Sequence, residues 1–252
     1  MPLRISAVLY RYVQPRAATP PKRLEALRML AEAGIPTTVM VAPVIPALND
    51  SEIERILDAA QDITHADGGT LYLIKEREEG KPVLEFEIMR NNSLQLRLGG
   101  TSGNPIQFAP LPLYRDDGSA NHNNIATHTA LTREMVNIED AYSVDYLDFS
   151  GTKAFDARSG YRSQSFLTVP LCNHASEIIG VLQLVNAKVP ETGKTVSFSK
   201  GLEPIVVALA SSAAIALDNQ ILLQDHKDLL DAFIKHMEAI GLNGYTRANI
   251  AT

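Results

Sequence analysis

The chain has 252 residues, of which 45% are hydrophobic and 21% charged, close to the values of ordinary globular proteins. This length suffices for one large domain, or for a medium domain with additional segments, and the composition allows a sizeable core. The formal net charge is −6 and the pI about 5.5, without a dense basic run, so nucleic acid is not expected as a partner.

The number of cysteines and the hydropathy of the chain indicate the cellular compartment. The single cysteine, Cys172, excludes an intrachain disulfide and a four-thiolate metal site, and it is typical of a reducing compartment. The first residues lack the charged-then-apolar pattern of a signal peptide. The longest weakly polar stretch, residues 205–217, is too short to span a bilayer and predicts a buried helix. We therefore expect a cytoplasmic protein with no membrane partner.

The first fifty residues differ from the rest in charge. They hold six Lys/Arg and three Asp/Glu, a balance of +3, whereas the remainder holds 17 and 26, a balance of −9. A helix is predicted after Thr19 and Pro20, which suit the N-cap and the first helical position, and Gly34 ends it. A buried strand is predicted over residues 37–42. This loop, helix and strand are part of one β/α barrel repeat, and they indicate a boundary near residue 50.

The next elements are a helix and a hairpin. Asp50 or Ser51 caps the helix, with Glu54 at capping-box distance from Ser51. Its apolar stripe consists of Ile53, Ile56, Leu57, Ala60 and Ile63. Residues 70–74 predict a strand, 76–81 a charged turn, and 83–90 an alternating strand that pairs with the first.

The second half of the chain predicts shorter elements and one long helix. Residues 91–121 are irregular and rich in Gly, Pro, Asn and Ser. A helix over 125–132, a strand over 136–138 and a loop with a short helix over 140–160 come next. Residues 165–171 and 178–186 predict a hairpin, and 200–240 a helical region. The fold class is therefore α+β: an antiparallel sheet flanked by helices, with an N-terminal α/β fragment and a long C-terminal helix.

Four segments in this order resemble the GAF family: residues 67–73, 160–171, 178–186, and Phe198 followed by 210–219. Residues 90–94, 99–103 and 149–156 are similar to GAF domains fused ahead of HD and HD-GYP phosphohydrolases. The resemblance implies a sensory, regulatory domain over residues 51–224. Residues 225–252 then form a signalling helix or a truncated lead-in to an HD domain, because residues 228–234 resemble such a lead-in. The HD catalytic pair does not follow, since His226 precedes Lys227.

Residues 1–50 resemble a different family. Residues 15–20, 22–34, 39–46 and 48–50 look like a late segment of a radical SAM barrel of the spore-photoproduct-lyase-like kind. That family holds an iron–sulfur cluster on three cysteines at C-x3-C-x2-C spacing, and clusters need thiolates. With Cys172 alone, no iron–sulfur cluster and no radical SAM activity are expected.

The residues themselves offer little catalytic chemistry. The six histidines, His65, His122, His128, His174, His226 and His236, include no pair at i, i+4 on a helix and are interpreted as scattered surface residues, so no metal is expected. Cys172 predicts a small buried hydrophobe, and Ser163 and Ser165 lack a nucleophile elbow. The glycine-rich residues 99–103 lack the lysine of a P-loop and predict a lid or a structural turn. No catalytic residue is predicted, and the chain is not expected to be an enzyme.

The resemblance implies a ligand between the sheet and the irregular insert. The candidate ligand-binding residues are Arg90, Asn92, Ser102, Phe155, Asp156, Tyr161, Arg162 and Ser165. An alternative is that these residues only fix the loop, with Asp156 and Arg162 paired to each other. The signature of cyclic-nucleotide-binding GAF domains is met at Asn186, Phe198 and Glu203 but not at Ala187 and Leu202. A cyclic nucleotide or another small metabolite is therefore the expected ligand.

The last helix predicts a second function. Ile215, Leu222, Leu229, Phe233 and Ile240 lie near heptad spacing, with Leu217, Ile221 and Met237 nearby, which favours a homodimer through paired helices. The hypothesis is a cytoplasmic sensor in which ligand occupancy orders the insert and biases the helices that an effector reads. The alternatives are a ligand-free dimerisation or interaction module, and an inactive radical SAM fragment fused to a GAF domain.

Overall fold

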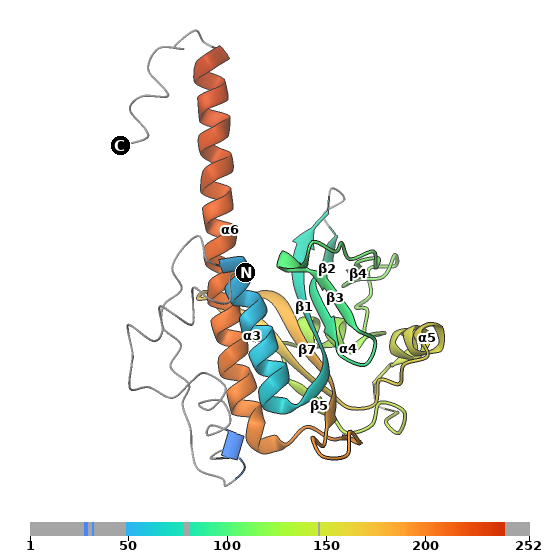
Figure 1. Ribbon diagram of the computed structural model, residues 1–252. Helices are drawn as coiled ribbons and strands as arrows, with labels where there is room; N and C mark the ends of the chain where they lie inside the picture. Colours follow the sequence, from blue (N-terminus) through green and yellow to red (C-terminus); the bar gives the residue numbers. More distant parts are fainter. Residues whose placement is uncertain (1–27, 30–31, 33–48, 78–80, 146, 240–252) are drawn as a thin grey trace, which may run out of the picture.

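The computed structural model describes residues 28–29, 32, 49–77, 81–145 and 147–239 (Figure 1). The predicted N-terminal helix and strand, and with them the barrel-like fragment over residues 1–50, lie outside these residues apart from a few positions. Ile240 and the closing residues 241–252 also lie outside. The sheet and the helices that cover it lie between residues 49 and 239.

The described elements are helices and antiparallel strands. In chain order they are α3 (Asn49–Thr64), β1 (Ala66–Glu76), β2 (Pro82–Asn91), β3 (Leu96–Gly99), the 3-10 turn η1 (Gly100–Ser102), β4 (Leu111–Pro112), α4 (Ile125–Thr132), β5 (Val136–Ile138), α5 (Ser150–Ser159), β6 (Phe166–Cys172), β7 (Ile178–Lys188), β8 (Thr195–Val196), the 3-10 turn η2 (Lys200–Leu202) and α6 (Glu203–Ala239). This order confirms the α+β class and an antiparallel sheet with a long C-terminal helix.

The sheet is built around the two long strands β1 and β7. Its order is β3-β2-β1-β7-β6-β5, with β4 added to β2 and β8 added to β7, and every pairing is antiparallel. β1 has eight consecutive buried residues, because both faces of this central strand are covered.

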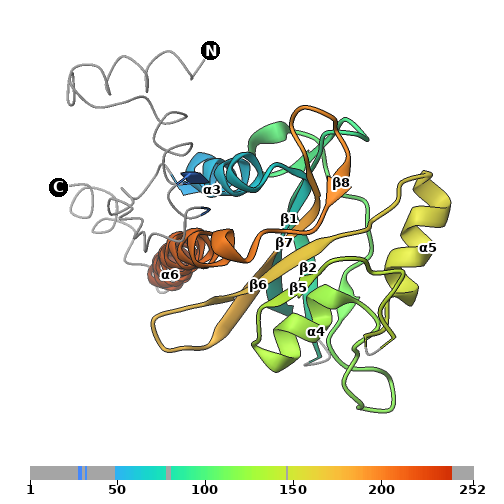
Figure 2. The same cartoon turned by 90° about the horizontal axis from the view of Figure 1, so that it is seen from below.

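Helices α3 and α6 lie side by side over one face of the sheet (Figure 2). Leu71 and Leu73 of β1 and Leu182 and Leu184 of β7 point to this face and join one core cluster with both helices. We call it the helix-covered face. The other face carries α4, α5 and the irregular segment between β3 and α4, and we call it the insert face. Thr70 and Tyr72 of β1 line the cavity on this side.

A β-bulge in β2 changes which face its side chains reach. Leu71 pairs with Ile88, whereas the next residue, Tyr72, pairs with Phe86, so Glu87 is the extra residue. Ile88 therefore joins the core of the helix-covered face, whereas Phe86, two positions earlier, packs with Tyr72 on the insert face. The predicted alternation of residues 83–90 is interrupted at this point.

Helix α6 has a buried first half and an exposed second half. Small side chains allow it to approach the sheet and α3 closely: Ala210, Ala213, Ala214 and Ala216 are all buried. After Asp218 the helix leaves the domain, and nearly all its described side chains are exposed. Among the described helices, α6 alone is long and apolar enough to cross a membrane by length and composition, and 44% of its apolar window is buried within the protein.

Two local predictions differ from the structure. Glu54, predicted for a capping box, has a carboxylate that accepts hydrogen bonds from the amide and hydroxyl of Thr101 and pairs with Arg90. Cys172, predicted as buried, is half-buried at the end of β6. The short strands β3, β4 and β8 were not predicted, because strands of two to four residues carry too little periodicity.

Candidate functional site

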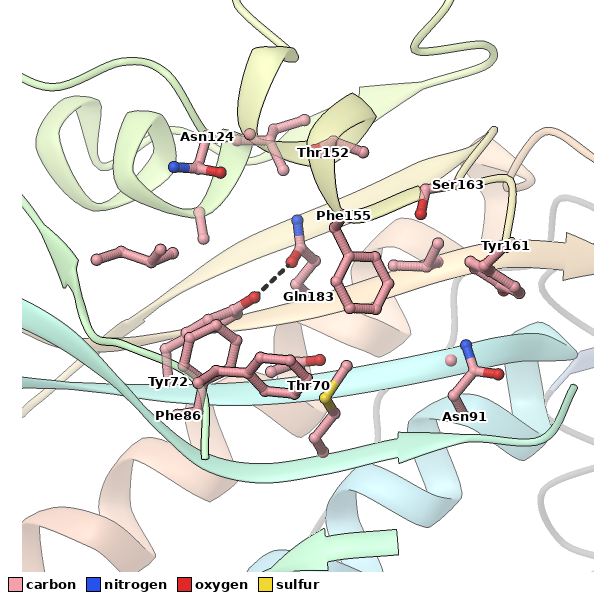
Figure 3. A pocket seen from close by; sticks show the side chains of 18 of the residues that line it. Thr70, Tyr72, Phe86, Asn91, Asn124, Thr152, Phe155, Tyr161, Ser163 and Gln183 are labelled. Carbon is pink, nitrogen blue, oxygen red and sulfur yellow. Dashed lines mark hydrogen bonds between the residues drawn. The ribbon is translucent and has the colours of Figure 1, made fainter. Parts of the chain in front are cut away.

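A cavity of about 470 Å³ lies between the insert face of the sheet and the elements that cover it (Figure 3). Its floor is formed by β1, β2, β6 and β7, and its roof by the start of α4 and by α5. One side is closed by residues 107–111. The volume lies within the range of small-molecule sites in proteins.

The roof depends on the close approach of two helix starts. Asn124 precedes α4, and Gly151 lies in the first turn of α5. A side chain on Gly151 would place its Cβ 2.2 Å from Oδ1 of Asn124, so it would displace the Asn124 side chain from its present position. The residues that face the floor come from both helices: Asn124, Ile125 and Ala126 from the start of α4, and Thr152 and Phe155 from α5.

Four aromatic rings form a continuous wall of the cavity. The ring centroids of Tyr72 and Phe86 are 4.8 Å apart, those of Phe86 and Phe108 are 5.5 Å apart, and those of Phe108 and Phe155 are 6.0 Å apart. The rings come from β1, β2, the 107–111 loop and α5. They offer flat apolar surfaces against which a planar molecule can stack.

The polar groups on the cavity are mostly neutral. The hydroxyl of Tyr72 donates to Oε1 of Gln183 at 3.0 Å, as Figure 3 shows, which leaves the amide nitrogen of Gln183 as a donor. Burial raises the pKa of Tyr72 far above its usual range, so the phenol stays protonated. Thr70, Asn91, Asn124 and Thr152 add hydroxyl and amide groups.

The charges around the cavity are positive and partly neutralised. Its lining contains two arginines and no carboxylate. Arg90 is buried, and its guanidinium lies 3.3 Å from Oε2 of Glu54 and donates to the carbonyl of Leu98 at 2.8 Å. Arg158 of α5 is exposed at the edge of the cavity. Since the guanidinium of Arg90 is paired with Glu54, Arg158 is the lining charge left for a bound molecule, and the cavity suits a neutral or anionic molecule better than a cation.

Tyr161 is held at the cavity by a network centred on Asp67. The Tyr161 hydroxyl donates to Oδ2 of Asp67 at 2.7 Å, and Oδ1 accepts from Ser93 at 2.9 Å and pairs with Nζ of Lys188 at 2.8 Å. Burial raises the pKa of Asp67, but the hydrogen bonds from Lys188, Tyr161 and Ser93 outweigh it and hold that pKa below its usual range. The ionised carboxylate of Asp67 thus joins three other segments: the β2–β3 turn, the loop after α5 and the end of β7.

Asp156 and Arg162 do not pair with each other. The carboxylate of Asp156 is buried and accepts hydrogen bonds from the Tyr142 hydroxyl at 2.6 Å and from the amide and hydroxyl of Ser163 at 2.8 and 2.7 Å. The guanidinium of Arg162 stacks over the Tyr142 ring, 4.1 Å from its centroid. Both residues therefore contact Tyr142 and, by these contacts, hold the segment that follows α5 in place.

The eight predicted ligand residues separate into two groups. Phe155 and Tyr161 line the cavity, and so does Arg90, although its guanidinium points to Glu54. The other five do not line it: Asn92, Ser102, Asp156, Arg162 and Ser165. Asn92 is exposed in the β2–β3 turn, Ser102 bonds to the Gly99 carbonyl, and Ser165 is fully buried.

Most of the lining was not predicted. The residues concerned include Thr70, Tyr72, Phe86, Phe108, Asn124 and Gln183. Alternation along strands 70–74 and 178–186 carries the signal that Thr70, Tyr72 and Gln183 share a face. It does not indicate which of the two faces is left partly open.

The partial cyclic-nucleotide signature belongs to the scaffold. Asn186, with φ 58°, accepts from the amides of Gln164 and Ser165 at 2.7 and 3.2 Å and donates to the Arg162 carbonyl at 2.8 Å. Glu203 accepts from Asn137 at 2.7 Å, and Phe198 is buried in the core. None of the three lines the cavity.

The glycine-rich residues 99–103 form a structural turn. Gly99 has φ 69°, and a Cβ there would lie 2.0 Å from the Glu87 carbonyl oxygen. The amide of Thr101 already donates to Glu54, so it is not free to cradle a phosphate. The prediction of a lid or turn is resolved in favour of the turn.

Two histidines interpreted as scattered surface residues are in contact. Nδ1 of His122 and Nδ1 of His128 are 3.1 Å apart, and both side chains are half-buried. Burial first, and the neighbouring His122 second, lower the pKa of His128. Within the described part of the chain, no group of three or more His, Cys, Asp or Glu is placed to hold a metal ion.

The GAF domain family model matches residues 50–217, about two thirds of the chain, and the chain therefore belongs to the GAF family. It is similar to cGMP-specific 3',5'-cyclic phosphodiesterases of Drosophila sechellia and Drosophila melanogaster, at 29% identity over 126 residues in both cases. These matches cover 49% of this chain and 9% and 10% of the two relatives, so the chain spans about a tenth of their length.

Solved structures that are similar to this chain include GAF domains of other proteins. One comes from an Acinetobacter phosphoenolpyruvate-protein phosphotransferase, with 15% identity, a TM-score of 0.48 and coverage of 83% of this chain and 99% of that chain. Another is a GAF domain/HD domain protein from Geobacter sulfurreducens, with 16% identity, a TM-score of 0.45 and coverage of 69% and 94%.

Proposed function

We propose that the protein is a sensory module that binds a planar, neutral or anionic small molecule in the cavity on its insert face. The observation that carries this proposal is the combination of four aromatic rings with neutral hydroxyl and amide groups around about 470 Å³. Stacking supplies affinity in such a site, and a few fixed polar groups supply orientation.

A cyclic nucleotide is the first ligand to test. The curated relatives are named cGMP-specific phosphodiesterases, and a purine offers the ring and the edge that Phe155 and Gln183 would meet. Arg158, exposed at the edge of the cavity, would pair with a phosphate. Ala187 and Leu202 depart from the cyclic-nucleotide pattern, so another heterocyclic metabolite is the second candidate ligand for the same cavity.

Binding rather than catalysis is the role that the lining favours. Among the described residues around the cavity there is no carboxylate, imidazole or thiol, the groups that general acid–base and nucleophilic catalysis use most. A bound molecule would act by ordering α5 and the 107–111 loop, which together carry ten of the 26 lining residues, and so shift the population of conformations.

The readout we propose is a homodimer through the second half of α6. Leu222, Leu229 and Phe233 are 45%, 70% and 53% exposed and lie seven and four residues apart, as residues at the a and d positions of a heptad do. Two such helices would bury these stripes against each other. The first half of α6 packs on the same strands whose opposite sides line the cavity, which offers a physical route from ligand to helix.

The ligand proposal is tested by calorimetry and thermal unfolding with cGMP, cAMP and a set of heterocyclic metabolites. A ligand at about 100 times its Kd stabilises the folded state by about 2.7 kcal/mol. Gln183→Ala and Phe155→Ala should weaken binding, whereas Asn92→Ala, which alters an exposed turn outside the cavity, should not. Stabilisation by none of the compounds would favour the ligand-free interaction module.

The dimer is tested separately by sedimentation of the full chain. We expect a dimer that Leu229→Lys with Phe233→Lys converts to a monomer, and Lys235→Glu serves as a matched control on the same helix. A wild-type monomer at all concentrations would contradict this part of the proposal. The remaining alternative, a radical SAM fragment, predicts iron after anaerobic reconstitution, and we expect none.

A further inference from the structure

The histidine pair lies outside the ligand cavity and is not used by the proposed function. Nδ1 of His122 lies 3.1 Å from Nδ1 of His128, the ring planes are inclined by 62°, and the ring centroids are 5.0 Å apart. His122 precedes α4, and His128 is the fourth residue of that helix. Two ring nitrogens that are both potential metal ligands thus lie next to each other.

The backbone on both sides of the pair is fixed independently of the rings. Next to His122, the buried Asn121 donates from Nδ2 to the Pro112 carbonyl at 2.7 Å and from its amide to the Leu113 carbonyl at 2.9 Å. The amide of His128 donates to the Asn124 carbonyl at 2.9 Å. The scaffold therefore brings the two imidazoles together before any ion binds, which reduces the ordering cost of binding.

The separation of the two nitrogens suits a transition metal. A metal ion about 2.05 Å from each Nδ1 would subtend an angle of about 98° between nitrogens 3.1 Å apart, which lies between octahedral and tetrahedral values. In the metal-free pair, one Nδ1 donates its proton to the other. With a metal, both protons reside on Nε2, and both Nδ1 lone pairs are ligands.

We propose that His122 and His128 form a two-imidazole site for a borderline divalent cation such as Zn²⁺, Ni²⁺ or Cu²⁺. Water completes the coordination, since no described group of three ligating side chains surrounds the pair. Imidazole nitrogens select these ions, with Cu²⁺ bound more tightly than Ni²⁺ or Zn²⁺, whereas Mg²⁺ and Ca²⁺ prefer oxygen ligands. The proposal does not depend on a ligand in the cavity.

A bound ion would also link the two ends of the segment between the histidines. Asn124, Ile125 and Ala126 lie in that segment, and all three belong to the roof of the cavity. The ion would therefore restrain the roof from outside the cavity, without contact with a molecule bound inside it.

The experiment is titration of the full chain, without a polyhistidine tag, with NiCl₂ and ZnCl₂ by calorimetry at neutral pH. We expect one ion per chain and no binding of MgCl₂. His122→Asn and His128→Asn should each weaken Ni²⁺ binding by about 10- to 100-fold or more, since the loss of a ligand costs at least as much as the loss of a ligand's hydrogen-bond partner. His226→Asn, at an exposed position of α6, is the matched control and should bind as the wild type does.

A second measurement does not require a variant. Electron paramagnetic resonance of the Cu²⁺-loaded wild type should show hyperfine coupling to two imidazole nitrogens. The proposal is overturned if the wild type binds none of the three ions stoichiometrically, if both single variants retain wild-type affinity, or if His226→Asn abolishes binding. Each outcome is independent of whether a small molecule binds in the cavity.

Discussion

The two faces of the sheet are formed by the same strands but are covered to different extents: one is packed against α3 and α6, and the other borders a cavity. On the helix-covered face, Leu71, Leu182 and Leu184 are almost fully buried under α3 and α6. On the insert face, their neighbours Thr70, Tyr72 and Gln183 border a cavity. The difference indicates that the helix-covered face is packed throughout, whereas the insert face combines buried clusters with an open space large enough for a small molecule.

The largest effect is expected where the helix-covered face contains a charge pair. Arg90→Met would leave Glu54 without its guanidinium partner in a largely buried position, and removal of one partner of a buried ion pair costs about 3–5 kcal/mol. Urea unfolding measures the loss. The double variant Arg90→Met, Glu54→Leu should recover part of it, and no recovery would show that packing rather than charge is responsible.

The next effect tests the apolar core of the same face. Leu182→Ala would open a cavity beneath α6 and should cost about 3 kcal/mol in unfolding free energy. Ligand affinity should change little, because Leu182 does not line the cavity. A loss below about 1 kcal/mol would contradict the view that this face is tightly packed.

A smaller effect is expected from the network that holds Tyr161, and it depends on pH. Lys188→Met removes a charged hydrogen-bond donor from Asp67 and should cost about 2 kcal/mol at pH 7. The folded-state pKa of Asp67 is lowered, so its contribution is present above the unfolded pKa and is lost as pH falls through the folded pKa. The difference between wild type and variant should therefore shrink below about pH 4. A constant difference down to pH 2 would contradict the assignment.

The smallest effect on stability is expected on the insert face. Phe108 is 38% exposed, and Phe108→Ala should change the unfolding free energy by about 0.5–1 kcal/mol. The same variant should reduce affinity for a stacking ligand, because Phe108 links the rings of Phe86 and Phe155. A stability loss as large as that of Leu182→Ala would abolish the proposed distinction between the two faces.

The sequence pattern predicted those helices and strands whose formation depends mainly on their own residues. The helix at 125–132 and the strand at 136–138 have the predicted bounds. The bulge at Glu87 was not predictable, because it depends on how β1 and β2 pair rather than on the residues of β2 alone. A bulge reverses the facing of the residues beyond it, so strict alternation along residues 83–90 would assign the wrong face on one side of Glu87.

The site was predicted less completely than the fold, for a physical reason. Asp156 and Arg162 have the chemistry of ligand contacts, but Ser163 and Tyr142 already satisfy or cover them. Polar residues in a loop are used either by the loop itself or by a ligand, and the sequence does not distinguish the two. The contact between His122 and His128 likewise depends on the path of the chain before α4.

Helix α6 continues without interruption from the core of the sheet to the far end of the described chain (Figure 1). From Asp218 to Ala239 it rises about 32 Å, so a tilt of about 5° at the sheet would displace its end by about 3 Å. A lever of this length converts a small change in the packing of Ala213 and Leu217 into a displacement comparable to the shift of one residue along a strand. A partner bound to the distal turns of α6 would thus respond to the tilt of the helix. The displacement it experiences would increase with the length of helix between the sheet and its binding site.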